Sequence, residues 1–376
     1  MKKTISILLS ATLLLSILAG CSGKNDPNAT PVPTAEPSGA VTEHDFAKAQ
    51  AAYDMDKVVM TVNGSEVTWD EFFYYLYSSI MYFEQQLGPI ADFTQTIPGN
   101  DSMSYSQLVV QYAADMATQF HVMAVNTVAA GVELDEEDKA ELQEVAEQDK
   151  IGYCGQDATD EDFDKYLESN YANRSIYDFV TKAPYLLMKC FETMYGEDGG
   201  LLPDEDVEAF ISDYGYMSCK HILILTRDAE GAELTDEQKA EKQAKAQELY
   251  EQFAAISDQA ALVQKFDELM NEYSEDTGLP YNPDGYTFTS GEMVAEFETA
   301  TKELEEYAVS EPVESSYGYH IILRLPTTQD SRTMDNYTMR YLAALNLYNV
   351  MVGNWFADAD VVWTPEFENL DVAALL

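Results

Sequence analysis

The sequence predicts an α+β protein made of a mostly helical part and a small domain that mixes strands and helices. Apolar residues recur at helical spacing through most of residues 46–213. Two largely apolar runs, 217–226 and 319–325, are typical of buried central strands, and they enclose three segments with helical patterns. A last helical pattern covers residues 335–356, and a strand-like run follows at 361–363.

The first residues predict export. Lys2 and Lys3 precede an apolar run, residues 5–18, that is too short to span a bilayer comfortably. The run ends in a Leu-Ala-Gly-Cys sequence that resembles a bacterial lipoprotein signal. This resemblance implies a signal peptide over residues 1–20 and a diacylated thiol on Cys21, which would anchor the chain to the outer face of the bacterial cell membrane. An ordinary secretory signal is the alternative.

A flexible tether is predicted for residues 21–45. The segment contains almost nothing apolar to bury, and its four prolines prevent a regular helix: Pro27, Pro31, Pro33 and Pro37. It would hold the folded body away from the membrane.

Composition narrows the partners of the chain. The formal net charge is −46 over 376 residues, and only 21 residues are Lys or Arg. Nucleic acid is excluded because phosphate binding needs patches of Lys and Arg. An anionic lipid surface would repel the folded body, which leaves the lipid as the main membrane contact. The acidic surface is either simply solvated or binds cations, such as calcium or cationic protein clients.

The cysteines predict neither a disulfide framework nor a metal site. If Cys21 is acylated, an odd number remain, Cys154, Cys190 and Cys219, without a CxxC pair. Buried free thiols are therefore expected. Cys219 and His221 lack a second ligand pair at the spacing of a zinc site. No cofactor and no metal are predicted.

The helical part opens with a predicted hairpin. Residues 58–62 are a β-branched run, and Asn63-Gly64 is the strongest short hairpin signal. Thr68 is then predicted to cap a helix, with Glu71 completing a capping box. Helical patterns follow at residues 72–87, 105–130, 135–150, 161–171, 176–195 and 203–214.

The first of these helices is crowded with aromatic residues and methionine. Eight fall within twelve residues: Phe72, Phe73, Tyr74, Tyr75, Tyr77, Met81, Tyr82 and Phe83. One helix cannot bury all of these on a single face. Two interpretations stay open, an apolar cradle for protein ligands or a helix packed on both sides in the core.

The small α+β domain is predicted over residues 214–329. Its order is a strand at 217–226, helices at 236–253, 258–273 and 292–304, and a closing strand at 319–325. This length is sufficient for a single hydrophobic core.

This region also carries short motifs in a fixed order. They are Ser218-Cys219-Lys220-His221-Ile222-Leu223-Ile224, Tyr273-Ser274-Glu275-Asp276, Gly291-Glu292-Met293-Val294-Ala295-Glu296-Phe297-Glu298, Ser310-Glu311-Pro312-Val313 and Tyr317-Gly318-Tyr319-His320-Ile321-Ile322-Leu323. Together they resemble a parvulin-type peptidyl-prolyl isomerase domain, which rotates the bond preceding proline. The resemblance implies a four-stranded sheet flanked by helices. The Val-Asn-Gly turn and Thr-x-x-Glu-Phe sequence within residues 62–72 resemble the N-terminal segment of the exported SurA/PrsA-like foldases.

The parvulin resemblance implies roles for five residues. Met293 and Phe297 match the pocket for the proline ring, and their spacing would place them on one helix face. His221 and His320 match two family histidines on adjacent central strands, whose rings would hydrogen-bond each other as catalytic or architectural groups. Asp276 matches a position that is Cys or Asp in the family, where a carboxylate would polarise the amide or accept a hydrogen bond. Each role has a plainer alternative. Met293 and Phe297 would be an ordinary core pair, His221 and His320 a structural pair, and Asp276 a surface residue at a helix end.

Other positions depart from the family. Residues 279–288 replace its Gly-Gly-Asp-Leu-Gly-x-Phe loop, and only Gly285 and Phe288 resemble that loop. Tyr286 would replace the lost Leu as a pocket wall, and Tyr317 stands where a small hydroxyl residue is common. Phe288, Tyr286 and Tyr317 are accordingly predicted to line the substrate site.

The combined prediction is a lipid-anchored, extracytoplasmic foldase of PrsA-like type. Unfolded secreted proteins would bind a helical chaperone domain, residues 46–213, completed by residues 330–376, whose helix returns onto it as in the related foldases. The parvulin-like domain, residues 214–329, would isomerise X-Pro bonds. Leu225 interrupts the basic cluster of phosphate-directed parvulins, so the predicted substrates are not phosphorylated.

Two alternatives to an isomerase share parts of this pattern. A non-catalytic holdase would use a degenerate parvulin domain only to bind peptides. A solute-binding lipoprotein would show a two-lobed α/β pattern that the sequence lacks. The sequence is compatible with a monomer and with a homodimer.

Overall fold

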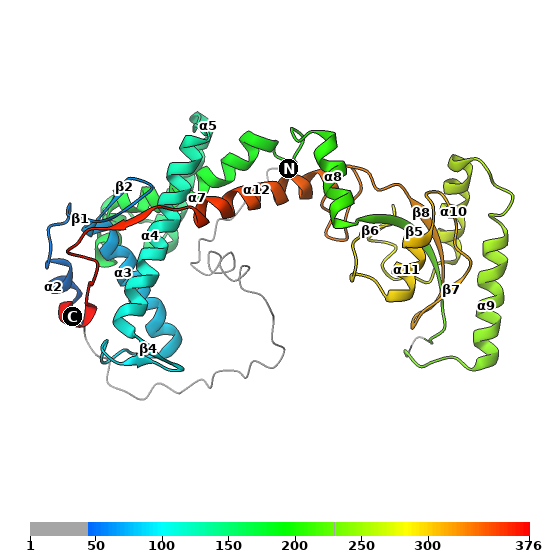
Figure 1. The fold of residues 1–376 in the computed structure, drawn as a ribbon, viewed down its shortest axis with the longest axis horizontal. Helices are drawn as coiled ribbons and strands as arrows, with labels where there is room; N and C mark the ends of the chain where they lie inside the picture. Colours follow the sequence, from blue (N-terminus) through cyan, green and yellow to red (C-terminus); the bar gives the residue numbers. More distant parts are fainter. Residues whose placement is uncertain (1–43, 229) are drawn as a thin grey trace. The chain divides into compact units, whose positions relative to one another are not determined.

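The computed structural model describes residues 44–228 and 230–376 (Figure 1). The predicted signal peptide, Cys21 and nearly all of the predicted tether therefore lie outside the described residues. The chain divides into two compact units, which we call the helical unit, residues up to 190 with 354–376, and the sheet unit, residues 191–353. Within the described ranges, no helix combines the length and the apolar character needed to cross a membrane. The predicted α+β class is confirmed.

The helical unit begins with helix α2 (Phe46–Gln50) and the predicted hairpin, β1 (Val58–Val62) with β2 (Ser65–Thr68). Asn63 and Gly64 form the turn, and both have the positive φ that such a turn requires. β9 (Val361–Trp363) pairs antiparallel with β1, so the C-terminal segment completes a three-stranded sheet.

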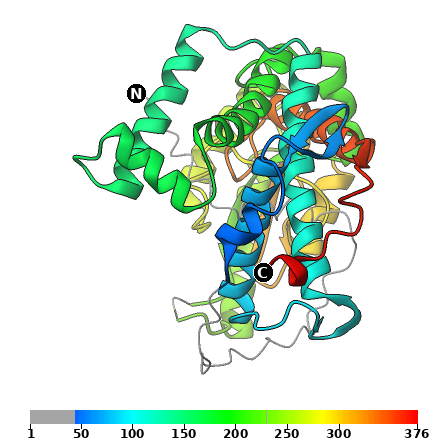
Figure 2. The same cartoon turned by 90° about the vertical axis from the view of Figure 1, so that its left-hand side faces the viewer.

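Five longer helices build most of the helical unit: α3 (Trp69–Leu87), α4 (Tyr105–Ala129), α5 (Glu136–Cys154), α6 (Asp160–Ser169) and α7 (Arg174–Tyr195). α3 and α4 lie side by side (Figures 1 and 2). A hairpin of β3 (Thr96–Ile97) and β4 (Asn100–Ser104) precedes α4, and no alternating pattern predicts it. The C-terminal helix of this unit is α13 (Val372–Leu375).

Four of the eight aromatic side chains of α3 are buried core residues. Trp69, Phe72, Phe73 and Tyr75 are at most 1% exposed. They pack in one cluster with side chains of α4 and with residues from the C-terminal segment, among them Phe367. Neighbours therefore cover α3 on more than one side, as the core interpretation requires.

The predicted capping box at the start of α3 is wrong. Thr68 is the N-cap residue but makes no side-chain hydrogen bond to the helix. The Glu71 carboxylate instead accepts a hydrogen bond from the Tyr75 hydroxyl at 2.9 Å and lies 2.9 Å from His121 Nε2. Tyr75, one turn along α3, and His121 of α4 thus satisfy this carboxylate in place of the backbone at the helix start.

The sheet unit contains helix α8 (Asp204–Tyr214) and a four-stranded sheet in the order β6-β5-β8-β7. All neighbouring strands are antiparallel. The strands are β5 (Met217–Leu225), β6 (Tyr286–Phe288), β7 (Val313–Glu314) and β8 (Gly318–Leu325). The helices around the sheet are α9 (Asp236–Glu251), α10 (Gln259–Tyr273) and α11 (Ala295–Glu303). The predicted four-stranded sheet is confirmed.

The two faces of the sheet have different cores. Ile222 and Ile321 point toward α9 and α10, whereas Cys219 and Ile322 pack with Phe297 of α11. Figure 1 shows α11 on the opposite side of the strands from α9 and α10. Side chains alternate between faces along a strand, so His221 and His320 lie on the α11 face.

The boundaries of the two compact units differ from the predicted domain boundaries at residues 213/214 and 329/330. The predicted domains therefore stay predictions. Val207 of α8 shares a buried cluster with Met339, Ala343 and Ala344 of α12 (Met339–Ala357). Most of α12 therefore belongs to the sheet unit, and only residues from 354 onward join the helical unit.

Candidate active site

The two strand histidines contact each other. His221 Nδ1 and His320 Nδ1 are 3.2 Å apart, and the ring centroids are 5.3 Å apart. In the β5–β8 register Leu223 is opposite His320, so His221 and His320 are diagonal neighbours on one face. Both side chains are buried.

Asp276 reaches this pair because the segment after α10 is attached to β5. The Glu275 N–H donates to the carbonyl of Leu223 at 2.8 Å, and the Leu223 N–H donates to Ser274 Oγ at 3.1 Å. These bonds place Asp276 Oδ2 3.1 Å from His221 Nε2. The structure thus brings together the three residues predicted as catalytic.

Three donors surround the Asp276 carboxylate. The Tyr286 hydroxyl donates to Oδ2 at 2.6 Å, and the Gly278 N–H donates to Oδ1 at 2.9 Å. Burial raises the pKa of Asp276, but the hydrogen bonds from His221, Tyr286 and Gly278 outweigh it and hold the pKa below its ordinary value. Asp276 is therefore a carboxylate at neutral pH, and burial followed by this hydrogen bond raises the pKa of Tyr286.

One proton arrangement satisfies the whole chain of contacts. Burial, followed by the neighbouring His221, lowers the pKa of His320 to about 3, so His320 is neutral. In this arrangement His221 Nε2 donates to Asp276, and a hydrogen bond joins the two Nδ1 atoms of His221 and His320. His320 Nε2 accepts from the Ser315 hydroxyl, 2.7 Å away. We call this series, Tyr286–Asp276–His221–His320–Ser315, the polar chain.

An apolar cluster lies against the polar chain. The Phe297 ring is 5.1 Å from the His221 ring and 5.2 Å from the His320 ring, in both cases edge to face. Phe288 is fully buried, with its ring 5.9 Å from that of Phe297. The partly buried Met293 packs against the same cluster. Phe288, Phe297 and Met293 thus pack in one cluster with Tyr286, and their role in substrate binding stays a prediction.

Met293 reaches the cluster in a different way from the one predicted. α11 starts at Ala295 with Val294 as its N-cap, so Met293 precedes the helix and shares no helix face with Phe297. The Glu298 carboxylate accepts from the Gly291 N–H at 2.7 Å, which keeps the preceding segment in a loop.

Tyr317 contributes its backbone to the site. Its N–H donates to Ser315 Oγ at 3.1 Å, and its carbonyl accepts from the Thr226 N–H at 3.1 Å. The ring is 53% exposed. Its role in lining the substrate site stays a prediction.

Ser315 is the member of the polar chain that sequence reasoning missed. β7 pairs with β8 so that Val313 is opposite His320. Ser315 lies in the tight turn between these strands, where its hydroxyl reaches the His320 ring. The hairpin register could have indicated it, but β7 has only two residues and leaves a weak pattern.

The thiol on this face is not a reactive group. Burial raises the pKa of Cys219 to about 12. Over residues 44–228 and 230–376, no three His, Cys, Asp or Glu side chains gather in a way that could hold a metal ion.

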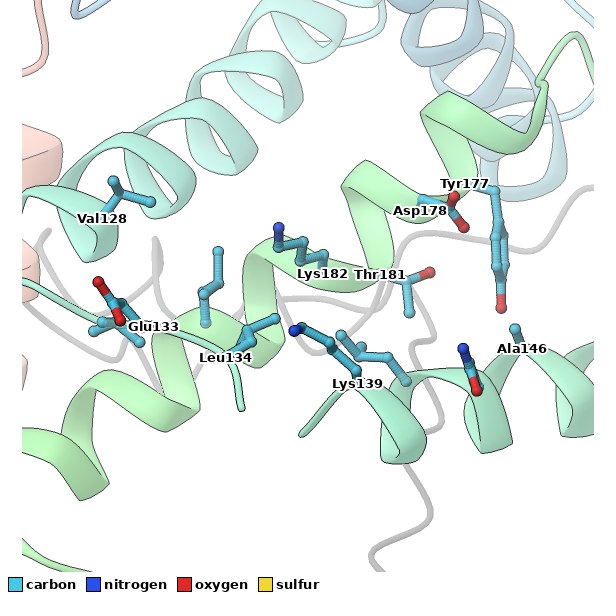
Figure 3. Close-up of a pocket in the computed structure, with 13 residues that line it drawn as sticks. Val128, Glu133, Leu134, Lys139, Ala146, Tyr177, Asp178, Thr181 and Lys182 are labelled. Carbon is cyan, nitrogen blue, oxygen red and sulfur yellow. The ribbon is translucent and has the colours of Figure 1, made fainter. Parts of the chain in front are cut away.

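The helical unit has a separate cavity of about 750 Å³ between the end of α4, the start of α5 and α7 (Figure 3). Its apolar lining is Val128, Val132, Leu134, Leu142, Ala146 and Leu186. Lys139 and Lys182 stand at the same cavity (Figure 3).

Comparison with known proteins identifies part of the chain. Residues 221–325 match the Rotamase family, described as a PPIC-type PPIase domain. The predicted parvulin-type domain is thereby confirmed for these residues.

Two curated relatives are foldases by name. The chain is 54% identical over 59 residues to "Foldase protein PrsA 1" of Bacillus cereus, covering 15% of this chain and 20% of that protein. It is 36% identical over 141 residues to "Foldase protein PrsA" of Halalkalibacterium halodurans, covering 32% and 39%. The matches thus span about a fifth to two fifths of these relatives' own lengths. A solved structure of PrsA from Bacillus subtilis is 18% identical, covers 81% of this chain and 91% of that one, and has a TM-score of 0.25.

Proposed function

We propose that this chain is an extracytoplasmic foldase, a peptidyl-prolyl cis-trans isomerase and chaperone that assists the folding of secreted proteins. The observation that carries the proposal is the polar chain, which lies against the apolar cluster of Phe288, Phe297 and Met293. Both lie inside the segment that matches the PPIC-type domain. The relatives named as foldases support the same reaction.

The proposed reaction needs no covalent step. An X-Pro bond rotates over a barrier of about 18–20 kcal/mol because rotation breaks the conjugation of the amide. An apolar slot formed by Met293, Phe297 and Phe288 would hold the proline ring and exclude water. Imidazoles whose N–H directions are fixed by the polar chain would present preorganised dipoles to the twisted amide, which favours the transition state over either planar form.

The proposed substrates are unphosphorylated X-Pro segments of unfolded proteins. Leu225 leaves no basic side chain at that position of β5, and a net charge of −46 disfavours phosphorylated ligands. The same charge disfavours nucleic acid as a partner.

The proposed chaperone surface is the cavity between α4, α5 and α7. Its lining is largely apolar, and the exposed Val128 stands at its edge. Unfolded clients expose apolar segments that such a surface would bind.

The proposed anchor is a diacyl lipid on Cys21, at the outer face of the bacterial cell membrane. It is supported by the Leu-Ala-Gly-Cys sequence that ends the predicted signal peptide. Replacement of Cys21 by Ala should release the protein from the membrane fraction, and retention of that variant would refute the lipid anchor.

The isomerase proposal is tested on a non-phosphorylated X-Pro tetrapeptide with residues 22–376. The expected result is catalysis by the wild type and its loss in Asp276→Ala and Met293→Ala. Asp236→Asn, an exposed carboxylate on α9 of the same unit, is the matched control and should retain full activity.

A non-catalytic holdase is the second candidate. The Tyr286 ring lies 5.4 Å from the His221 ring and fills space beside the polar chain. A filled site favours a domain that binds peptides without isomerising them. No turnover by a folded wild type that still suppresses aggregation would select the holdase.

A further inference from the structure

Tyr286 makes two different contacts at the site. Its side chain is 9% exposed, with the ring edge against His221 and the hydroxyl 2.6 Å from Asp276 Oδ2. A pocket wall would need only the ring. The hydroxyl is part of the polar chain, so the two contacts imply two separable roles.

The surrounding backbone accommodates this hydroxyl. A Cβ placed on Gly278 would lie 2.3 Å from Tyr286 Oη, and the Gly278 N–H also donates to Asp276. A Cβ on Gly285 would lie 2.4 Å from the carbonyl oxygen of Cys219, so the glycine allows β6 to begin against β5. Both glycines keep the Tyr286 side chain in its place over Asp276.

The donors around Asp276 leave its two oxygens in different states. Oδ2 accepts from His221 and Tyr286, which occupies both lone pairs, whereas Oδ1 accepts from Gly278. The Asp276 carboxylate therefore accepts its hydrogen bonds from groups of the protein itself. Without the Tyr286 hydroxyl, the carboxylate would keep only the bonds from His221 to Oδ2 and from Gly278 to Oδ1, and its orientation would be less firmly fixed.

We propose that Tyr286 is a positioning residue for the isomerase: its hydroxyl orients the Asp276 carboxylate and, through it, fixes the proton arrangement of His221 and His320. This inference rests on the proposed function. Tyr286 acts through Asp276, so losing the hydroxyl should slow rotation of the bound X-Pro bond and leave peptide binding unchanged.

The test compares Tyr286→Phe with the wild type in residues 22–376. We expect the isomerisation rate to fall about tenfold or more, as for the loss of a hydrogen bond to a charged group, while the Kd for an X-Pro peptide changes less than about twofold. Tyr281→Phe is the matched control, because Tyr281 lies in the same loop and is 86% exposed. Gly278→Ala should reproduce the loss of rate by displacing the hydroxyl while Tyr286 itself stays.

A second readout separates this inference from the proposed function. The chain has four histidines, so the imidazole ¹⁵N resonances can be assigned with single His variants. We expect Tyr286→Phe to shift the resonances of His221 and His320 and to leave those of His44 and His121 in place. A full rate together with unchanged imidazole resonances in Tyr286→Phe would overturn the positioning role. If the wild type has no isomerase activity, the proposed function fails, and the ¹⁵N comparison alone decides the inference.

Discussion

His221 and His320 meet through their Nδ1 atoms at 3.2 Å although 99 residues separate them in the sequence. The contact exists because β5 and β8 are neighbours in the sheet and run antiparallel. Helices α9, α10 and α11 all lie between these strands in the sequence. The polar chain can therefore form only when β5 and β8 have paired, which makes the state of these two imidazoles a sensitive report on the folded sheet.

Acid should destabilise the protein through His320. Its pKa is about 3 in the folded chain against an ordinary 6.5, so between these values the unfolded chain binds a proton that the folded chain does not. The free energy of unfolding should then fall by up to about 1.4 kcal/mol per pH unit as the pH drops from 6.5. Asp276, whose pKa is lowered, adds a further fall below its ordinary value of 3.8.

Urea unfolding followed by circular dichroism at pH 7 and pH 5 measures this effect. His320→Gln should lose much of the pH dependence, whatever its absolute stability. Equal slopes in the variant and the wild type would contradict a neutral, buried His320.

Gly285 should tolerate no side chain. It has φ +99°, and a Cβ would lie 2.4 Å from the backbone oxygen of Cys219. Gly285→Ala should cost about 3 kcal/mol from the strained backbone and the clash together. Gly291→Ala is the matched control, because Gly291 has φ +90° but nothing within 4 Å of its Cβ, and it should cost only about 1 kcal/mol. Thermal unfolding of both variants measures the difference, and equal losses would refute the close approach of β6 to β5.

The three described cysteines should differ in reactivity. Cys219 is buried with a pKa raised to about 12, whereas Cys154 is partly exposed. Iodoacetamide at pH 8 should modify Cys154 in the native protein and leave Cys219 unmodified, as read by peptide mass spectrometry. Urea-unfolded protein, labelled at all three positions, is the control. Rapid native labelling of Cys219 would contradict the packing of α11 on the sheet.

Client binding by the helical unit should depend on its cavity. Val128 is 63% exposed and lines that cavity, so Val128→Asp should weaken suppression of aggregation of an unfolded protein by roughly tenfold, through the loss of apolar contact and repulsion of apolar segments. Leu201→Asp is the control, since Leu201 is 66% exposed in the sheet unit and should change little. Equal suppression by wild type and Val128→Asp would exclude the cavity as the client site.

The sequence predicted the strongly patterned parts of the structure well. The long helices, the Asn63-Gly64 hairpin and strands β5 and β8 follow from periodicity and turn chemistry. The residues of the site followed from a resemblance to a known family, because the pattern alone cannot bring His221, His320 and Asp276 together.

The misses share a physical cause, which is that polar side chains take hydrogen-bond partners that hydrophobic periodicity does not encode. Glu71 was predicted to cap a helix, but Tyr75 and His121 take its carboxylate. Met293 was predicted on a helix, but the bond from Gly291 to Glu298 keeps it in a loop. Ser315 contacts His320 across a hairpin too short to leave a pattern.

The most direct test of the account is the cis-trans exchange rate of an unphosphorylated X-Pro peptide, measured by NMR exchange spectroscopy with catalytic amounts of residues 22–376. The uncatalysed reaction takes tens of seconds or longer. We predict exchange cross-peaks with the wild type and their loss in the double variant His221→Ala, His320→Ala. A folded wild type that binds the peptide without accelerating its exchange would contradict the isomerase assignment.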